Sequence, residues 1–210
     1  MIEIYGTPLS ANYRKVTAVA DKLAIEITSR PVNVYAGAGQ SVDYLAVNPL
    51  GQIPTLVDGD FVLHESNAIV RYLARDSELL GGSVRERAKV DQWLFWESGQ
   101  WQPALADVMA PHVGHQLLPD SLPKPERAVD WDSAPCARQL DFLDQQLKAQ
   151  WLVGEHLTIT DFSVAGMTTY FPCCAFPFAR YPNIERWYRR MQGLVEWQRS
   201  EDPLWAVPGG

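Results

Sequence analysis

The stretch from residue 48 to residue 73 constrains the fold most, because its pattern changes from strand to helix within a few residues. Thr55–Val57 and Phe61–Leu63 are short apolar segments separated by Asp-Gly-Asp, which predicts a β-hairpin. Beyond the hairpin, apolar residues recur at a helical period, and Ser66 is placed to be the N-cap. A helix that starts directly after a strand presents unpaired backbone N–H groups. The sequence therefore predicts a carboxylate-binding position at the start of this helix.

The residues before this stretch alternate between strand and helix patterns. We expect, in chain order, a strand over 1–6, a helix from Ala11, a strand over 25–34 and a short helix over 41–47. The helical period from Ala11 places Arg14 and Lys15 on the solvent side. Pro31 near the end of the second strand favours a sheet edge. With the hairpin and its helix, this order predicts an α/β thioredoxin-like domain over residues 1–77.

The second half of the chain lacks convincing strand patterns. Residues 76–82 read as a linker, and a second domain over residues 84–210 is predicted to be all-α. Ser83 with Glu86, and Thr158 with Asp161, have the spacing of capping boxes that open helices. Further helices are expected over 137–150 and after Pro182, with a loop over 117–132 and a tail that packs back on the bundle.

Composition narrows the classes of protein and partner. With 210 residues, 47% hydrophobic and 20% charged, the chain is typical of a soluble globular protein in one or two domains. Its net charge of −7 argues against nucleic-acid and anionic-membrane partners. The N-terminus is polar where a signal peptide would be apolar, so we expect a cytoplasmic protein. Cys136, Cys173 and Cys174 have no zinc-site spacing, no metal is predicted, and the adjacent pair is expected to be reduced.

Two motifs carry a resemblance to a known family. Pro-x-Gly-Gln-Ile-Pro-Thr-Leu over 49–56 and His-Glu-Ser-x-Ala-Ile over 64–69 resemble the glutathione-binding half of the glutathione S-transferases, in that family's order and spacing. The resemblance implies that Ile53 offers its backbone to the cysteinyl unit of glutathione and that Pro54 follows a cis bond. It also implies that Glu65 meets the γ-glutamyl ammonium and Ser66 the carboxylate. The architecture of the family, a thioredoxin-like domain and then a helical one, extends the resemblance to nearly the whole chain.

In this family the thiol of glutathione must be held as the reactive thiolate. Lowering a thiol pKa of about 8.5 by two units requires about 2.7 kcal/mol of preference for the anion. A hydrogen-bond donor at a helix N-terminus can supply that preference. Ser10 lies where the first turn meets the first helix, at the position of the catalytic serine in serine-type (theta- and delta-like) members. It would donate a hydrogen bond to the sulfur and would not be a covalent nucleophile.

Other donors stay open. Asn12 is similar to an asparagine with which a bacterial (nu-like) subset also reaches the sulfur, and Tyr5 is a rival from the first strand. Ser10 has the simpler interpretation of an N-cap, and Asn12 that of an exposed first-turn residue. The family's basic residue for the glycine carboxylate is missing, and Gln40 and Gln52 stand in its two usual places. Arg14 or a residue of a second subunit could substitute.

The site for the second substrate is expected between the domains. Trp96, Trp101 and Met109 are candidate walls for an apolar electrophile, with core packing as the alternative for each. His112 and His115 lie three residues apart without a third ligand, and we interpret them as surface residues.

The sequence thus predicts a cytoplasmic, homodimeric glutathione transferase with glutathione as co-substrate. It would conjugate apolar electrophiles and could reduce organic hydroperoxides. The alternatives are glutathione-dependent dehalogenation, or a non-catalytic binding or stress-response protein with the same fold. The first 77 residues contain no cysteine, which disfavours exchange through a mixed disulfide.

Overall fold

A four-stranded mixed sheet, in the order β2-β1-β3-β4, forms the base of the computed structural model, which describes residues 1–205. β1 (Ile2–Gly6) pairs in parallel with β2 (Ile27–Pro31) and antiparallel with β3 (Thr55–Asp58), and β4 (Phe61–Leu63) completes the predicted hairpin. The predicted edge position of the second strand is confirmed. At the centre of the sheet Ile4 lies opposite Leu56, and both side chains are fully buried.

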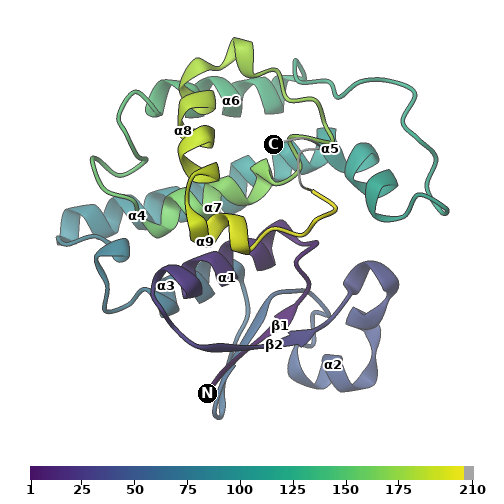
Figure 1. The fold of residues 1–210 in the computed structure, drawn as a ribbon, viewed down its shortest axis with the longest axis vertical. Coiled ribbons are helices and arrows are strands. Elements are labelled where there is room, and N and C mark those ends of the chain that lie inside the picture. Colours follow the sequence, from purple (N-terminus) through teal and green to yellow (C-terminus); the bar gives the residue numbers. More distant parts are fainter. Residues whose placement is uncertain (206–210) are drawn as a thin grey trace.

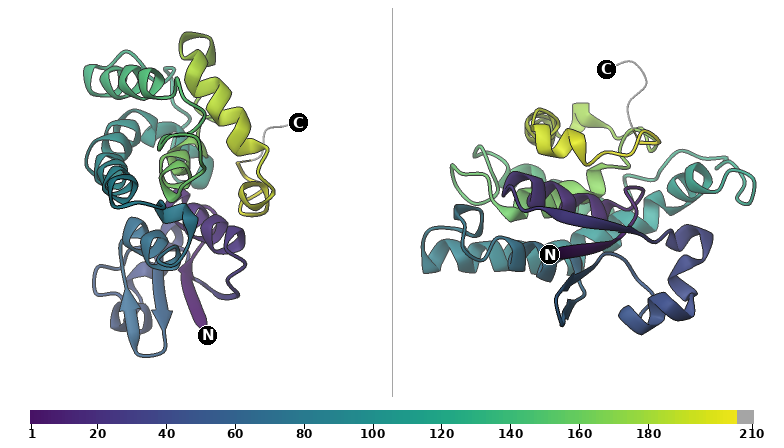
Figure 2. Two further views of the ribbon diagram at one scale, coloured as in Figure 1. Left: turned by 90° about the vertical axis from the view of Figure 1, so that its left-hand side faces the viewer. Right: turned by 60° about the horizontal axis from the view of Figure 1, so that its bottom comes forward.

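Three helices belong to this part of the chain: α1 (Ala11–Lys22), α2 (Val42–Val47) and α3 (Ser66–Leu73). α1 and α3 form a layer between the sheet and the helices of the second half, as Figures 1 and 2 show. α1 packs against α3 on one side and against α7 and α9 of the second half on the other. The thioredoxin-like architecture predicted for the first part of the chain is confirmed.

The middle position of α1 overturns one prediction. Arg14 and Lys15 were expected in solvent, yet both side chains are completely buried. The helical period correctly identifies the apolar stripe that faces the sheet, but the opposite face of α1 is covered by the second half of the chain. Their charges are therefore met inside the protein and not by water.

The rest of the described chain is helical, and no strand occurs between residues 64 and 205. The helices are α4 (Val84–Trp96), a π turn (Glu97–Trp101), α5 (Gln102–Leu117), α6 (Ala134–Gln146), α7 (Ile159–Thr168), α8 (Pro182–Gln192) and α9 (Val195–Arg199). Short 3₁₀ turns occupy Val34–Ala36, Ala38–Gln40, Glu78–Leu80 and Phe178–Arg180. α6 starts earlier than predicted because its first turn accommodates Pro135, which needs no N–H partner there. No helix within residues 1–205 is long and apolar enough to cross a bilayer.

The tail packs back on the bundle as far as it is described. Trp197 and Trp205 are buried, and the Trp205 indole N–H donates to the carbonyl of Leu9 at 3.1 Å. This contact connects the end of the described chain to the turn before α1. Residues 206–210, also part of the predicted tail, lie outside the described residues.

The two predicted capping boxes differ in their surroundings. At the exposed start of α4, the N–H of Glu86 donates to Ser83 Oγ at 3.2 Å, and the N–H of Ser83 donates to Glu86 Oε2 at 3.0 Å. At the start of α7, Asp161 is fully buried and accepts the N–H of Thr158 at 3.0 Å. Asp161 also accepts the N–H of Leu152 and the indole N–H of Trp187. The second box therefore joins α7 to the preceding loop and to α8.

This difference gives a matched pair of substitutions. We expect Asp161→Asn to lower the free energy of unfolding by roughly 1–3 kcal/mol, because an amide replaces an acceptor that buried donors require. Burial raises the pKa of Asp161 to about 6, so the carboxylate is ionised at pH 8, where urea unfolding should be measured. Glu86→Gln is the control in the exposed box and should cost about 1 kcal/mol or less. Equal losses in the two variants would contradict this account.

Candidate functional site

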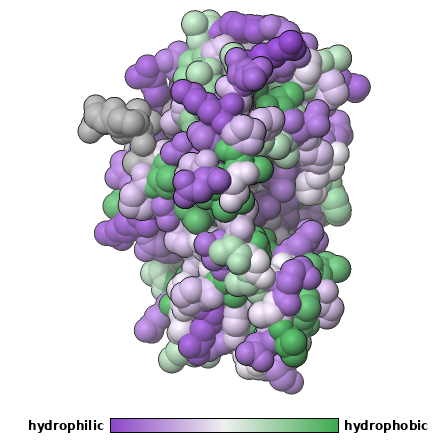
Figure 3. Space-filling view, turned by 90° about the vertical axis from the view of Figure 1, so that its right-hand side faces the viewer, coloured by the Kyte–Doolittle hydropathy of each residue, from purple (hydrophilic) through white to green (hydrophobic). Residues whose placement is uncertain are grey.

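Two cavities meet at the N-terminal end of α1. The first has a volume of about 250 Å³ and lies between α3, the loop before β3 and the π turn. The second has a volume of about 430 Å³ and lies between α1 and α5. Asn12, Gln102 and Ala106 line both, so the two spaces share a border. On the face drawn in Figure 3, the surface is hollowed between the helical part and the part that carries α2.

The first cavity brings together residues that are separated in the sequence. Its lining includes Gln52, Ile53, Pro54, Glu65 and Ser66, all of which the sequence singled out. The Ile53–Pro54 bond is cis. The carbonyl of Gln52 accepts hydrogen bonds from the side chains of Tyr44 and Asn48, which fix the loop before β3.

The start of α3 differs from the prediction by one residue. Glu65 is the N-cap, with φ +65° and ψ 109°, and Ser66 is the first residue of the helix. Because Glu65 has this left-handed backbone, the chain turns one position earlier than the polar pattern suggested. The hydroxyl of Ser66 is free of capping and instead donates to Asn12 Oδ1 at 3.3 Å.

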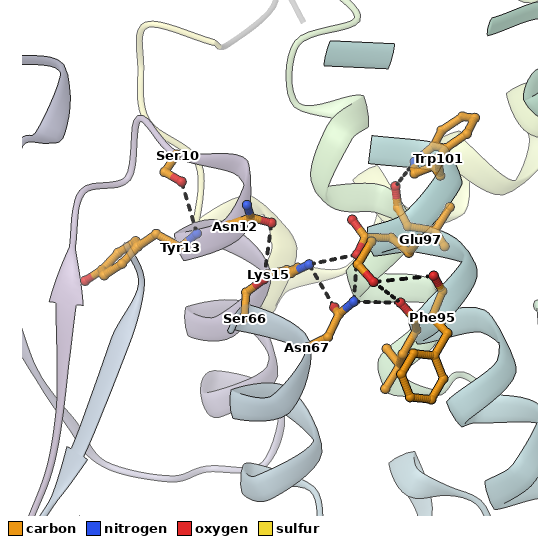
Figure 4. A network of polar contacts seen from close by, with 12 residues as sticks. Ser10, Asn12, Tyr13, Lys15, Ser66, Asn67, Phe95, Glu97 and Trp101 are labelled. Carbon is orange, nitrogen blue, oxygen red and sulfur yellow. Dashed lines mark hydrogen bonds and ion pairs between the residues drawn. The ribbon is translucent and has the colours of Figure 1, made fainter. Parts of the chain in front are cut away.

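Ser10 and Asn12 each keep one hydrogen-bond donor available. Ser10 is the N-cap of α1, and its Oγ accepts the N–H of Tyr13 at 3.4 Å, which leaves its own O–H hydrogen unused. Asn12 accepts from Ser66 through Oδ1, and among the described residues no acceptor meets its Nδ2. Figure 4 shows Asn12, in the first turn of α1, beside Ser66 of α3, with Ser10 in the turn that precedes α1. Ser10 lines the second cavity and Asn12 lines both.

Comparison with known proteins identifies the family. Two family models match: the glutathione S-transferase N-terminal domain over residues 2–75 and the glutathione S-transferase C-terminal domain over residues 132–190. The chain is 31% identical over 195 residues to the probable glutathione S-transferase GSTF2 of Oryza sativa subsp. japonica, with 89% of each protein covered. The chain belongs to the glutathione S-transferase family.

Further comparisons agree with this assignment. Glutathione S-transferase 3 of Zea mays is 31% identical over 209 residues, which covers 95% of this chain and 92% of the maize protein. The solved structure of glutathione S-transferase-I bound with the ligand lactoylglutathione superposes with a TM-score of 0.81 at 26% identity. That superposition covers 95% of this chain and 97% of the solved one.

Within this transferase, three polar residues considered from the sequence lie apart from both cavities. The hydroxyl of Tyr5 donates to Glu3 at 3.1 Å, and its ring packs against Tyr44. Gln40 is exposed beside Gly51 and does not line the first cavity. Arg14 cannot substitute for the missing basic residue, because its buried guanidinium already binds Glu201, at 3.1 Å, and other partners on the α7 and α9 side.

The aromatic walls predicted for the electrophile pocket are partly wrong. Met109 lines the second cavity, but Trp96 and Trp101 do not. Trp101 is fully buried and donates its indole N–H to the carbonyl of Val164 at 3.1 Å. Trp96 donates to Gln139 on α6 at 3.0 Å and borders a different groove. The alternative interpretation, core packing, holds for both, since Trp101 is 0% and Trp96 8% exposed.

A buried polar network beside the first cavity was not found from the sequence. Lys15 Nζ donates to Asn67 Oδ1 at 2.8 Å and to Glu97 Oε2 at 3.2 Å. Asn67 Nδ2 donates to the same Glu97 oxygen at 2.7 Å, and Figure 4 shows the three side chains converging from α1, α3 and the π turn. Asn67 and Glu97 also line the first cavity. The available signal was a glutamate within a Trp-rich apolar helix, which indicates a buried partner without naming it.

This network connects three elements with one ion pair. Burial lowers the pKa of Lys15, and the Glu97 carboxylate opposes that shift. The side chains of both residues are only 1% exposed, so neither charge is compensated by water. Oε1 of Glu97 accepts no hydrogen bond from the described residues. The pair therefore holds the wall of the first cavity in place through α1.

Removing one charge tests this role. We expect Glu97→Gln to lower the free energy of unfolding by roughly 3–5 kcal/mol, because it leaves the Lys15 ammonium buried without a counter-ion. Lys15→Met alone should also destabilise, since it leaves the carboxylate unpaired. The double variant Lys15→Met/Glu97→Gln should recover most of the loss. Chemical denaturation of all four proteins measures the coupling, and simple addition of the two single losses would rule out an interacting pair.

Proposed function

We propose that this transferase joins the thiol of glutathione to apolar electrophilic small molecules. The observation that carries the proposal is the border between the two cavities, which Asn12 lines, with Ser10 close by in the lining of the second cavity; Ser10 O–H and Asn12 N–H are both available as donors. Glutathione occupies the first, polar cavity, and the electrophile occupies the second. The sulfur then lies at the border, within reach of both donors.

In the first cavity the γ-glutamyl end binds at the start of α3. The backbone N–H of Ser66 and the other N–H groups of the first helical turn meet the carboxylate, because a helix N-terminus favours an anion. Glu65 meets the ammonium. Ile53 pairs its backbone with the cysteinyl unit, beside Pro54. Gln52 donates amide hydrogens to the glycine carboxylate, and Gln40, beside Gly51 and outside the cavity lining, reaches the same carboxylate only from the rim; both are weaker partners than a charged group would be.

At the border the donors keep the sulfur ionised. A hydrogen bond to the thiolate favours the charged form, and the N-terminus of α1 adds its positive field. The thiolate attacks an electrophilic carbon held in the second cavity, whose lining is mostly apolar and includes Met109, Val113 and Leu117. The same thiolate can instead attack the outer oxygen of an organic hydroperoxide that fits this cavity, which releases the alcohol, and a second glutathione converts the resulting sulfenic acid into glutathione disulfide and water.

The comparisons identify the family but do not support the branch that the sequence suggested. The sequence favoured a bacterial, theta- or delta-like branch, but the curated relatives named above are rice and maize proteins and give it no support. We therefore keep only the serine-type donor, which rests on the place of Ser10 at the start of α1. Residues 1–77 and 84–210 are proposed as the two domains. A cytoplasmic location fits the free thiols of all three cysteines.

A homodimer is proposed from the surface between α3 and α4. Phe95 is 78% exposed and borders a cavity of about 500 Å³ that includes Ala68, Arg71 and Leu94. A large exposed aromatic beside a groove is typical of a surface that another chain covers. That groove also touches Glu65 and Asn67, so a second subunit would lie next to the glutathione site.

The thiolate donors can be separated by substitution. We expect Ser10→Ala to lower kcat for conjugation of glutathione with a chloronitrobenzene by roughly tenfold or more, about 1.4 kcal/mol of transition-state stabilisation. Asn12→Asp keeps the size of the side chain but replaces the N–H donor with an acceptor, and this single variant should also have a lower kcat than the wild type. Tyr5→Phe is the control and should leave kcat unchanged. A normal rate in Ser10→Ala together with a lost rate in Tyr5→Phe would overturn the assignment.

The dimer surface has its own test. Phe95→Glu should convert the protein from dimer to monomer in light scattering, because it places a charge on the proposed contact. Val42→Glu is the matched control, since Val42 is 84% exposed but lies on α2. A Phe95→Glu protein that remains dimeric would refute this surface.

A further inference from the structure

The turn that follows α7 holds two adjacent cysteines whose sulfur atoms face each other. Cys173 Sγ and Cys174 Sγ lie 3.8 Å apart, and both thiols are free. Cys173 is partly exposed, whereas Cys174 is 2% exposed. Neither residue lines the two cavities of the glutathione site.

The backbone around the pair is fixed by packing. The N–H of Cys174 donates to the carbonyls of Tyr170 and Phe171, both at 3.2 Å. The rings of Phe171 and Phe176 stack on each other at 3.9 Å, on either side of the two cysteines in the sequence. Cys173 Sγ also donates to the carbonyl of Tyr170 at 3.2 Å, so the turn fixes both the backbone of the pair and the position of the first sulfur.

The two thiols have different electrostatic surroundings. The two Sγ atoms lie within hydrogen-bond distance, and the contact with the Cys174 thiol lowers the pKa of Cys173. The same contact, together with burial, raises the pKa of Cys174. The accessible sulfur is thus the more nucleophilic one, and the buried sulfur keeps its proton beside it.

We propose that Cys173 and Cys174 form a chelating dithiol site for trivalent, thiophilic electrophiles of the arsenoxide class. Cys173 attacks first, forming one As–S bond with the hydrated arsenical, R–As(OH)₂, and its thiol proton leaves with the displaced hydroxide as water. Cys174 then forms the second As–S bond, and its proton leaves with the second hydroxide. The products are the cyclic dithioarsenite and two water molecules, and arsenic stays trivalent, so no oxidant or reductant is required.

The geometry favours this ligand over a disulfide between the two residues. A disulfide requires the sulfurs to approach to about 2 Å, and it normally joins Cα atoms about 4.4–6.8 Å apart. Neighbouring residues have Cα atoms only about 3.8 Å apart. A bridging arsenic atom is larger and soft, which suits sulfur ligands, and it lets the two sulfurs stay well separated.

The test is binding of phenylarsine oxide to the intact protein, followed by mass spectrometry under non-reducing conditions. The wild type should bind one equivalent that survives a wash with excess glutathione, because a monothiol displaces a single As–S bond but not a chelate. A dithiol such as dimercaptopropanol should remove it. Cys173→Ala and Cys174→Ala should each lose the wash-resistant adduct, and Cys136→Ala, a buried thiol elsewhere, should keep it.

A second readout uses only the wild type and so does not depend on how the variants fold. Bound phenylarsine oxide should block alkylation of Cys173 by iodoacetamide, as seen by peptide mapping. Release of the arsenical from the wild type by excess glutathione would overturn the proposal. So would a wash-resistant adduct in either Cys173→Ala or Cys174→Ala. Ser10→Ala should bind the arsenical as the wild type does, so this result is independent of the proposed function.

Discussion

The hydrogen bond from Ser66 to Asn12 joins the starts of two helices, and the arrangement of the site depends on it. It holds the first turn of α1 against the first turn of α3, so both positive helix ends border the same space. It also engages the oxygen end of the Asn12 amide, which leaves the nitrogen end for another acceptor. One contact thus sets both the place of the anion-binding helix and the direction of a donor.

The buried network beneath this contact fixes the distance between the two halves of the chain. Lys15 extends from the face of α1 away from the sheet and meets Asn67 and Glu97. A buried ion pair is weak evidence for stability as such, but breaking one is costly, so the pair tolerates little relative movement of the elements it joins. The π turn over Glu97–Trp101 places the carboxylate there, and π turns are frequent at functional sites.

The fold was largely readable from the sequence, because strand alternation, the hairpin turn and the Ser83 and Thr158 boxes are local signals. The site was readable only in part. The two family motifs correctly predicted that Ile53, Pro54 and Ser66 line one cavity, because both motifs belong to backbone segments that the fold brings together. The burial of Arg14 and Lys15 was not predicted, because hydrophobic periodicity identifies the helix face that packs on the sheet but gives no information on a second layer that covers the opposite face. Trp96 and Trp101 were named as pocket walls because an aromatic residue suits a core and an apolar pocket equally, and the sequence does not tell the two apart. The left-handed backbone of Glu65 has no signal in the sequence either.

The most direct measurement of the central claim is the pKa of glutathione bound to the protein, from a pH titration of its ultraviolet thiolate absorbance. The account predicts a value about two units below that of a free thiol near 8.5 in the wild type, with much of the shift lost in Ser10→Ala. Bound glutathione that stays protonated at neutral pH would contradict it, because Ser10 and Asn12 would then have no anion to stabilise.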